Sequence, residues 1–162
     1  MSIGRFLRGA LLFAALVALH YSIRPFLGWR AAPDFLIIAL LIVAVRVRPG
    51  VATIAGFALG LLADALAPGH LGAAALGMSI IGYSASWLKA MFFADNLVLN
   101  AFFFFLGKWG FDLLHLVAEG RIGASGFAMQ ALLWSPLSAA VTALTGVLLL
   151  LLLRPLLEVR ST

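Results

Sequence analysis

Long apolar runs, almost free of charge, follow one another along this chain, and short turns containing proline, glycine or arginine separate them. The run from Leu137 to Leu153 has no charged residue. A helix rises about 1.5 Å per residue, so about 20 such residues cross the ~30 Å hydrocarbon core of a bilayer. Only 10% of the 162 residues are charged and 64% are hydrophobic, whereas a soluble domain carries about 25% charge. The chain is therefore predicted to be an all-α integral membrane protein.

The order of runs and turns predicts a single domain, 1–162, of six transmembrane helices. The expected spans are about 7–23, 33–47, 50–67, 71–88, 97–119 and 126–153. The first is expected to be a retained helix rather than a cleaved signal peptide, because no polar sequence follows it. The second is short for a bilayer, which leaves a re-entrant segment as an alternative, and Asp34 is expected to cap its N-terminus. Pro136 predicts either a kink in the last span or an interfacial piece before a straight span.

The basic residues predict the orientation of the spans. If both termini lie on one side, that side holds Arg5, Arg8, Arg46, Arg48, Lys89, Arg154 and Arg160. The opposite side then holds Arg24, Arg30 and Arg121. The positive-inside rule therefore places both termini of this multi-pass chain in the cytoplasm. No basic stripe with interleaved aromatic residues is present, so nucleic-acid binding is not expected.

Sequence motifs of common catalytic and cofactor sites are missing. The chain has no cysteine, and His20, His70 and His115 are not at ligand spacing from one another, so no metal site is expected. The phosphate-binding loop GxxxxGK(S/T) and the motifs HExxH and GxSxG do not occur. We therefore expect no catalytic residue and no cofactor. A small membrane subunit that works through contacts with partners fits this sequence best.

Small residues and one acid share a helix face in the span 50–67. Ala52, Gly56, Gly60 and Asp64 lie at i, i+4, i+8 and i+12. Gly56 and Gly60 form a GxxxG pair, the spacing that lets two helix backbones approach closely in a bilayer. We expect this face to pack against another helix, of this chain or of a partner protein. The alternative is ordinary packing within a small bundle, with Asp64 merely near the interface.

A second polar set, Lys108, Asp112 and His115, lies at i, i+4 and i+7 of the span 97–119 and so shares one face. The lysine and the aspartate can neutralise each other, which lowers the cost of burial. The pattern is compatible with a structural ion pair, a proton relay or a polar partner contact. Asp64 and Asp112 are predicted at similar depth in the outer half of the bilayer. If their two helices face one another, Asp64 joins this set in an outward-facing polar cluster.

Local motifs occur in a characteristic order in the first half of the chain. They are Pro33-Asp34 before an apolar run, a basic turn at Arg46–Gly50, Gly56-Phe57, Gly60-Leu61-Leu62-Ala63-Asp64, and Leu71-Gly72. This order resembles the MreD family, whose members are rod shape-determining membrane proteins of bacteria. The motif-bearing part covers about residues 33–83. The length, the number of spans and the cytoplasmic termini extend the resemblance over the whole chain.

The resemblance implies a non-enzymatic subunit of the rod complex, or elongasome, which builds the lateral cell wall from the inner (cytoplasmic) membrane. It implies binding to MreC, a single-span protein with a large periplasmic domain, within the lipid membrane. MreB, RodA and its class B penicillin-binding protein are implied as indirect partners in peptidoglycan synthesis. The resemblance also implies a six-helix fold similar to the S component of energy-coupling-factor transporters.

That similarity supplies an alternative function. A vitamin-binding S component would hold its ligand in an outward-facing pocket, and Asp64, Asp112 and His115 are placed to serve one. The short loops, which are poor in polar residues, argue against it. A proton-coupled transporter is a third possibility, but the sequence offers few ionisable groups for a path through the membrane.

Overall fold

The computed structural model describes residues 11, 13–22, 32–66, 71–92, 96–120 and 124–157, and every regular element in these ranges is a helix. A helix at Phe13–Ser22 comes first. The following elements are α2 (Phe35–Ala44), α3 (Pro49–Leu66), α4 (Ala73–Phe92), α5 (Leu97–Glu119), α6 (Ala124–Met129), the π-helix η1 (Gln130–Trp134) and α7 (Ser135–Leu157). The predicted all-α class is confirmed. Residues 7–10 of the first predicted span, the loop 24–30 and His70 lie outside the described residues.

Within the described ranges, three helices are long and apolar enough to cross a membrane: Pro49–Leu66, Leu97–Ala118 and Gly126–Leu152. Two further apolar helices, Phe13–Ser22 and Phe35–Ala44, are shorter. α4 has 20 residues but is not among the three. Length and composition of the described helices thus support membrane insertion, and the number of six spans stays a prediction.

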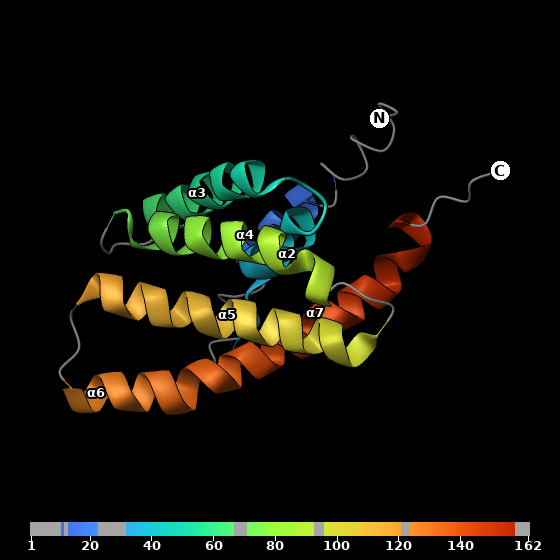
Figure 1. Ribbon diagram of the computed structural model, residues 1–162. Helices are drawn as coiled ribbons and strands as arrows, with labels where there is room; N and C mark the ends of the chain where they lie inside the picture. Colours follow the sequence, from blue (N-terminus) through green and yellow to red (C-terminus); the bar gives the residue numbers. More distant parts are fainter. Residues whose placement is uncertain are drawn as a thin grey trace.

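Two antiparallel helix pairs make up most of the bundle (Figure 1). α3 packs along α4 and α5 packs along α7, and these are the two most extensive helix contacts. α4 also packs against α5, so it lies between α3 and α5 and joins the two pairs. The connections 67–72 and 93–96 are short, which makes successive helices antiparallel neighbours.

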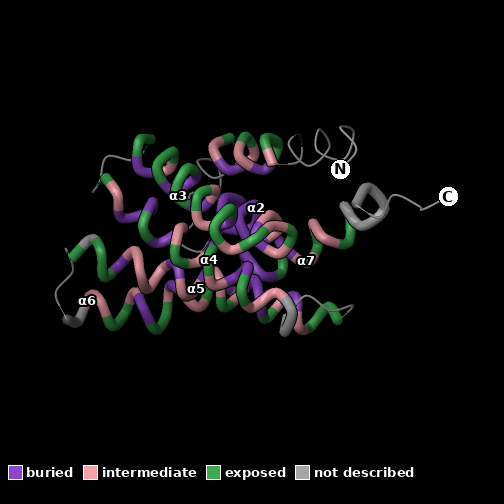
Figure 2. The backbone as a smooth tube through the Cα atoms, turned by 45° about the horizontal axis from the view of Figure 1, so that its top comes forward, coloured by how far each residue is buried: buried purple, intermediate pink, exposed green. Residues whose placement is uncertain are grey.

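α2 lies at the centre of the bundle and is buried almost all round (Figure 2). Ile37, Ile38 and Leu40 have no exposed surface. α2 contacts α3, α4, α5 and α7, and a helix surrounded in this way needs apolar side chains on every face. That requirement explains its unbroken apolar sequence, FLIIALLIVA. The ten residues of α2 form a helix about 15 Å long, half the thickness of the hydrocarbon core of a bilayer. The second apolar run of the sequence is short because it forms this short, buried helix.

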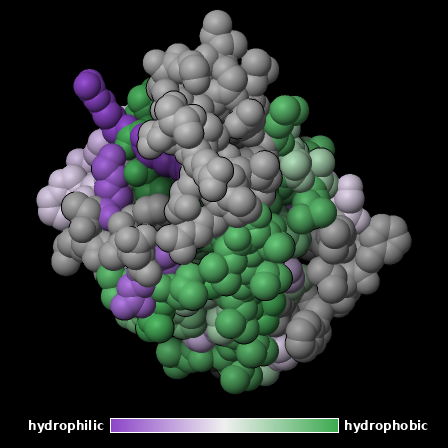
Figure 3. All heavy atoms as spheres, turned by 90° about the vertical axis from the view of Figure 1, so that its right-hand side faces the viewer, coloured by the Kyte–Doolittle hydropathy of each residue, from purple (hydrophilic) through white to green (hydrophobic). Residues whose placement is uncertain are grey.

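The outward faces of the long helices are apolar. Ile54 on α3, Trp87 on α4, Val98 on α5 and Leu144 on α7 each expose more than 70% of their surface. Figure 3 shows hydrophobic residues gathered over a broad area of one side of the molecule. Apolar surface on this scale marks contact with a membrane or with partner proteins.

The last long helix contains a π turn that Pro136 helps to explain. The N–H of Ser135 donates to the Gln130 carbonyl, five residues back, and Pro136 has no N–H to donate. The Ala131 carbonyl therefore lacks its usual helical donor. The indole Nε1 of Trp109 on α5 donates to this carbonyl oxygen at 3.2 Å. The irregularity predicted at Pro136 is thus a π turn, and α5 supplies the missing hydrogen bond.

Trp109→Phe is expected to destabilise the chain by about 1–3 kcal/mol, because it leaves the Ala131 carbonyl without a donor in apolar surroundings. Pro136→Ala supplies a new N–H at this point, so Trp109→Phe should cost less in the Pro136→Ala background. Thermal unfolding of both single variants and the double variant in one detergent measures the difference. Equal costs in the two backgrounds would show that packing of the indole, not its hydrogen bond, stabilises the turn.

Candidate functional site

Asp34 lies at the N-terminus of α2, in the interior of the bundle. Its Oδ1 accepts hydrogen bonds from the N–H groups of Leu36 at 3.2 Å and Ile37 at 3.3 Å. These bonds satisfy two of the N–H groups that a helix leaves unpaired at its start. The predicted N-cap is therefore confirmed. The N–H of Asp34 in turn donates to Oγ1 of Thr142 on α7, at 3.1 Å.

The ammonium group of Lys108 on α5 lies between two carboxylates. Its Nζ is 3.0 Å from Oδ2 of Asp34 and 2.6 Å from Oδ1 of Asp112. The side chains of Lys108 and Asp34 are each only 5% exposed. Charges buried to this extent are tolerated only when their partners are close and well oriented, and removing one partner is strongly destabilising. This arrangement makes Lys108 and its two carboxylates energetically dependent on one another.

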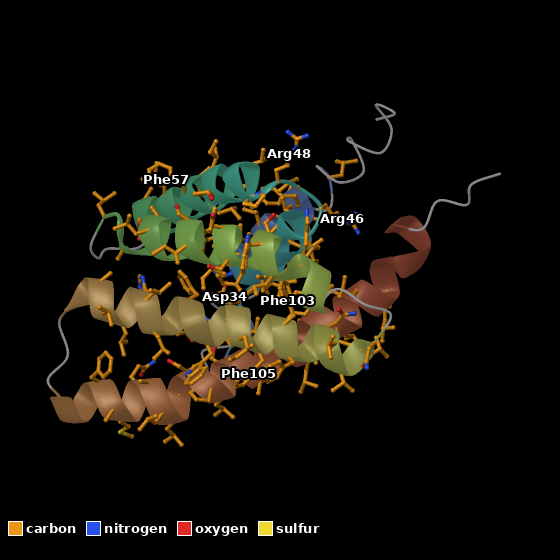
Figure 4. All side chains as sticks on the ribbon, in the orientation of Figure 1. Asp34, Arg46, Arg48, Phe57, Phe103 and Phe105 are labelled. Atoms are coloured by element: carbon orange, nitrogen blue, oxygen red, sulfur yellow. The ribbon has the colours of Figure 1, made fainter. Side chains whose placement is uncertain are left out.

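His20, on the helix Phe13–Ser22, completes the group, with its Nδ1 3.5 Å from Oδ1 of Asp34. We use the name Asp34 cluster for five residues: His20, Asp34, Lys108, Asp112 and Thr142. The cluster joins the helix Phe13–Ser22, α2, α5 and α7 near the centre of the bundle, where Figure 4 labels Asp34. Directional contacts of this kind hold membrane helices together, since apolar contacts alone have little advantage over contact with lipid.

The predicted set on α5 combines polar contacts with a ring contact. Lys108 and Asp112 form the expected pair. His115 stacks on Phe111 with 5.5 Å between the ring centroids and also interacts electrostatically with Asp112. The Lys108 Nζ lies 5.2 Å from the centroid of the same Phe111 ring. The bond from Lys108 to Asp34 was not predicted, because 74 residues separate the two in the chain. The available signal was an acid at the start of an otherwise apolar run.

Asp64, near the end of α3, caps the start of α4. Its carboxylate accepts hydrogen bonds from the N–H groups of Gly72 at 2.9 Å, Ala74 at 3.1 Å and Ala75 at 3.0 Å. The prediction that Asp64 joins Asp112 in an outward-facing cluster is wrong. α4 lies between α3 and α5, so the two helices do not face one another as that cluster required.

The turn before α4 explains why Gly72 accompanies Asp64 in the sequence motif. Gly72 adopts a left-handed backbone conformation, with φ of 104°, which glycine reaches without steric cost. This turn brings the first N–H groups of α4 around the carboxylate of Asp64. A second motif, Pro33-Asp34, lies at the start of α2. The motif Pro33-Asp34 and the pairing of Asp64 with Gly72 therefore each mark a carboxylate-capped helix start.

The small-residue face of α3 packs against α4 of the same chain. A Cβ atom at Gly56 would clash with the Met78 backbone, and one at Gly60 would clash with the Ala74 backbone. Ala52, on the same face, has no exposed surface. Helix backbones approach this closely only where side chains are missing from the interface. The face is thus occupied within the chain and is not available to a partner helix.

These groups offer hydrogen bonding and ion pairing. The carboxylates of Asp34 and Asp64 accept N–H groups at helix starts, and Asp112 pairs with Lys108. Among the described residues, no group of three or more histidine, aspartate or glutamate side chains is placed to hold a metal ion. The geometry therefore accounts for helix assembly, and it leaves the outward surfaces to contact other molecules.

A family model described as rod shape-determining protein MreD matches residues 1–159 of the chain. Neither a curated protein nor a solved structure gives a significant match. The matched range includes the Asp34 cluster, the Asp64 cap and the small-residue face of α3.

Proposed function

Since this chain belongs to the MreD family of rod shape-determining proteins, we propose that it is a non-enzymatic subunit of the rod complex in the bacterial inner membrane. In this role it binds MreC and supports lateral peptidoglycan synthesis, and thereby rod shape. MreB, RodA and its class B penicillin-binding protein are the indirect partners. The observation that carries the proposal is the family match over residues 1–159.

The interior of the bundle supports a role in assembly rather than in chemistry. The charged groups of Asp34, Lys108 and Asp112 bind one another and a helix start, and Asp64 binds the start of α4. Groups engaged in this way fix the positions of helices. The apolar outward faces then remain as the surfaces for a partner helix, because α4 covers the small-residue face of α3.

A vitamin-binding S component finds no support. Its pocket required Asp64, Asp112 and His115 to converge, but Asp64 caps α4 and Asp112 pairs with Lys108. A proton-coupled transporter needs a series of titratable groups through the membrane. The Asp34 cluster is a single compact group.

Six spans with both termini in the cytoplasm remain part of the proposal. α4 follows α3 along its length: Asp64 binds the first turn of α4, and Ser86 near its other end donates to Val47 at 2.7 Å. α4 therefore crosses the same thickness as α3, a helix that is long and apolar enough to span the membrane. The basic turn between α2 and α3 is then cytoplasmic.

Native mass spectrometry of the chain, purified in mild detergent from its own membranes, tests this function. We expect a single-span protein with a large periplasmic domain to remain bound in a fixed ratio. In cells, deletion of the chain should cause loss of rod shape, and the full chain should restore it. A stoichiometric small molecule without such a subunit would contradict the proposal and favour the S component.

A further inference from the structure

The turn between α2 and α3 carries two exposed arginines, Arg46 and Arg48, on either side of Val47. The Val47 carbonyl oxygen accepts hydrogen bonds from Oγ of Ser86 at 2.7 Å and from Nζ of Lys89 at 3.0 Å. These bonds attach the turn to the end of α4 and place a third cation beside it. Figure 4 shows Arg46 and Arg48 projecting from this end of the bundle in different directions.

These cations have no acidic partner among the described side chains. The ion pairs there all belong to the Asp34 cluster, and Asp64 is bound to the start of α4. Partial burial lowers the pKa of Arg46 from its ordinary value, with no carboxylate to offset the loss of water. The turn therefore presents concentrated positive charge to whatever surrounds this end of the bundle.

The surface next to the turn is apolar and continues along a helix that can span the membrane. On the outer side of α3, Val51 is 53% exposed and Ile54 is 71% exposed, within two turns of Arg48. On α4, Trp87 is 71% exposed, two residues before Lys89. Exposed tryptophan is typical of the membrane–water interface. The order from basic turn to apolar helix face matches a phospholipid, with its charged headgroup above its acyl chains.

We propose that the α2–α3 turn binds anionic phospholipids, with Arg46 and Arg48 contacting headgroup phosphates and the acyl chains lying against the outer face of α3. The guanidinium fork matches the geometry of phosphate oxygens, and juxtamembrane basic residues attract anionic lipid. The apolar surface directly below the arginines favours lipid over an acidic soluble protein. This inference concerns lipid and does not depend on MreC binding.

The test uses the full chain in detergent micelles that contain equal amounts of phosphatidylglycerol and phosphatidylcholine. Native mass spectrometry counts the lipids of each kind that stay bound. We expect the wild-type chain to retain phosphatidylglycerol preferentially. Each of Arg46→Gln and Arg48→Gln should reduce that preference by about fivefold, and the double variant should lose most of it.

The matched control is Arg24→Gln with Arg30→Gln, which removes the same charge from the side predicted to be opposite. It should keep the preference for phosphatidylglycerol. The proposal fails if the wild-type chain binds both lipids equally, or if the control loses as much preference as the Arg46/Arg48 variant. It also fails if an acidic protein rather than lipid is released by Arg48→Gln. The unfolding temperatures of the Arg46 and Arg48 variants should stay unchanged, because both side chains are exposed. If the double variant does not fold, the lipid preference of Arg48→Gln alone tests the proposal.

Discussion

Asp34→Ala is expected to destabilise the bundle more than any other replacement of a single polar residue, by about 3–5 kcal/mol. The change removes the cap on α2, the bond to Lys108 and the contact with His20 together. Lys108 then keeps Asp112 as its remaining carboxylate partner, and the first N–H groups of α2 lose their acceptor in the bundle interior. Thermal unfolding in one detergent, compared with the unchanged chain, measures the loss.

Two further variants separate the parts of this effect. Asp34→Asn keeps a side-chain oxygen that can cap α2 but removes the charge that faces Lys108, so we expect an intermediate loss. Asp112→Ala leaves the bond between Lys108 and Asp34 in place, so it should cost less than Asp34→Ala. A larger loss from Asp112→Ala than from Asp34→Ala would mean that the cluster is not organised around Asp34.

The parts of the Asp34 cluster that the sequence predicts are those within one helix. Capping of α2 by Asp34 follows from a polar residue just before an apolar run, and the pair Lys108–Asp112 follows from i, i+4 spacing. The bonds that join the helices connect Asp34 with Lys108 and with Thr142, 74 and 108 residues away. Helix periodicity describes faces but not which faces meet, so these bonds required the three-dimensional structure.

The prediction that placed Asp64 with Asp112 was wrong for the same reason, because the sequence does not show which helix faces meet. The helical rise gives the depth of Asp64 and Asp112 in the membrane, but depth alone does not show which helices are neighbours. The sequence does show a small-residue face on α3 and an abundance of small residues in 71–88. The simplest interpretation of these two features is that the small-residue face of α3 packs closely against the helix in 71–88, and the structure has this arrangement. The short connection 67–72 also favours antiparallel packing of α3 and α4 over a contact between α3 and α5.

Gly60→Leu is expected to prevent the α3–α4 pair from forming. Even the Cβ of Gly60→Ala would clash with the Ala74 backbone, which cannot move aside as a flexible side chain could. We therefore expect Gly60→Ala to cost about 1–3 kcal/mol and Gly60→Leu to cost more. Unfolding temperature and the yield of folded protein after purification measure these effects, and cell shape reports on function.

Gly50→Ala is the matched control, because a Cβ at Gly50 has no atom within 4 Å. Alanine is intrinsically better than glycine in a helix by about 0.5–1 kcal/mol, so this control should be neutral or slightly stabilising. Alanine is also intrinsically favoured over glycine at position 60 of the helix. Any loss of stability in Gly60→Ala must therefore come from the clash with α4. Because α3 and α4 are two of the main helices of the bundle, loss of their packing should remove rod shape and the proposed binding of MreC together. Unchanged folding and shape in Gly60→Leu would contradict the packing of this face.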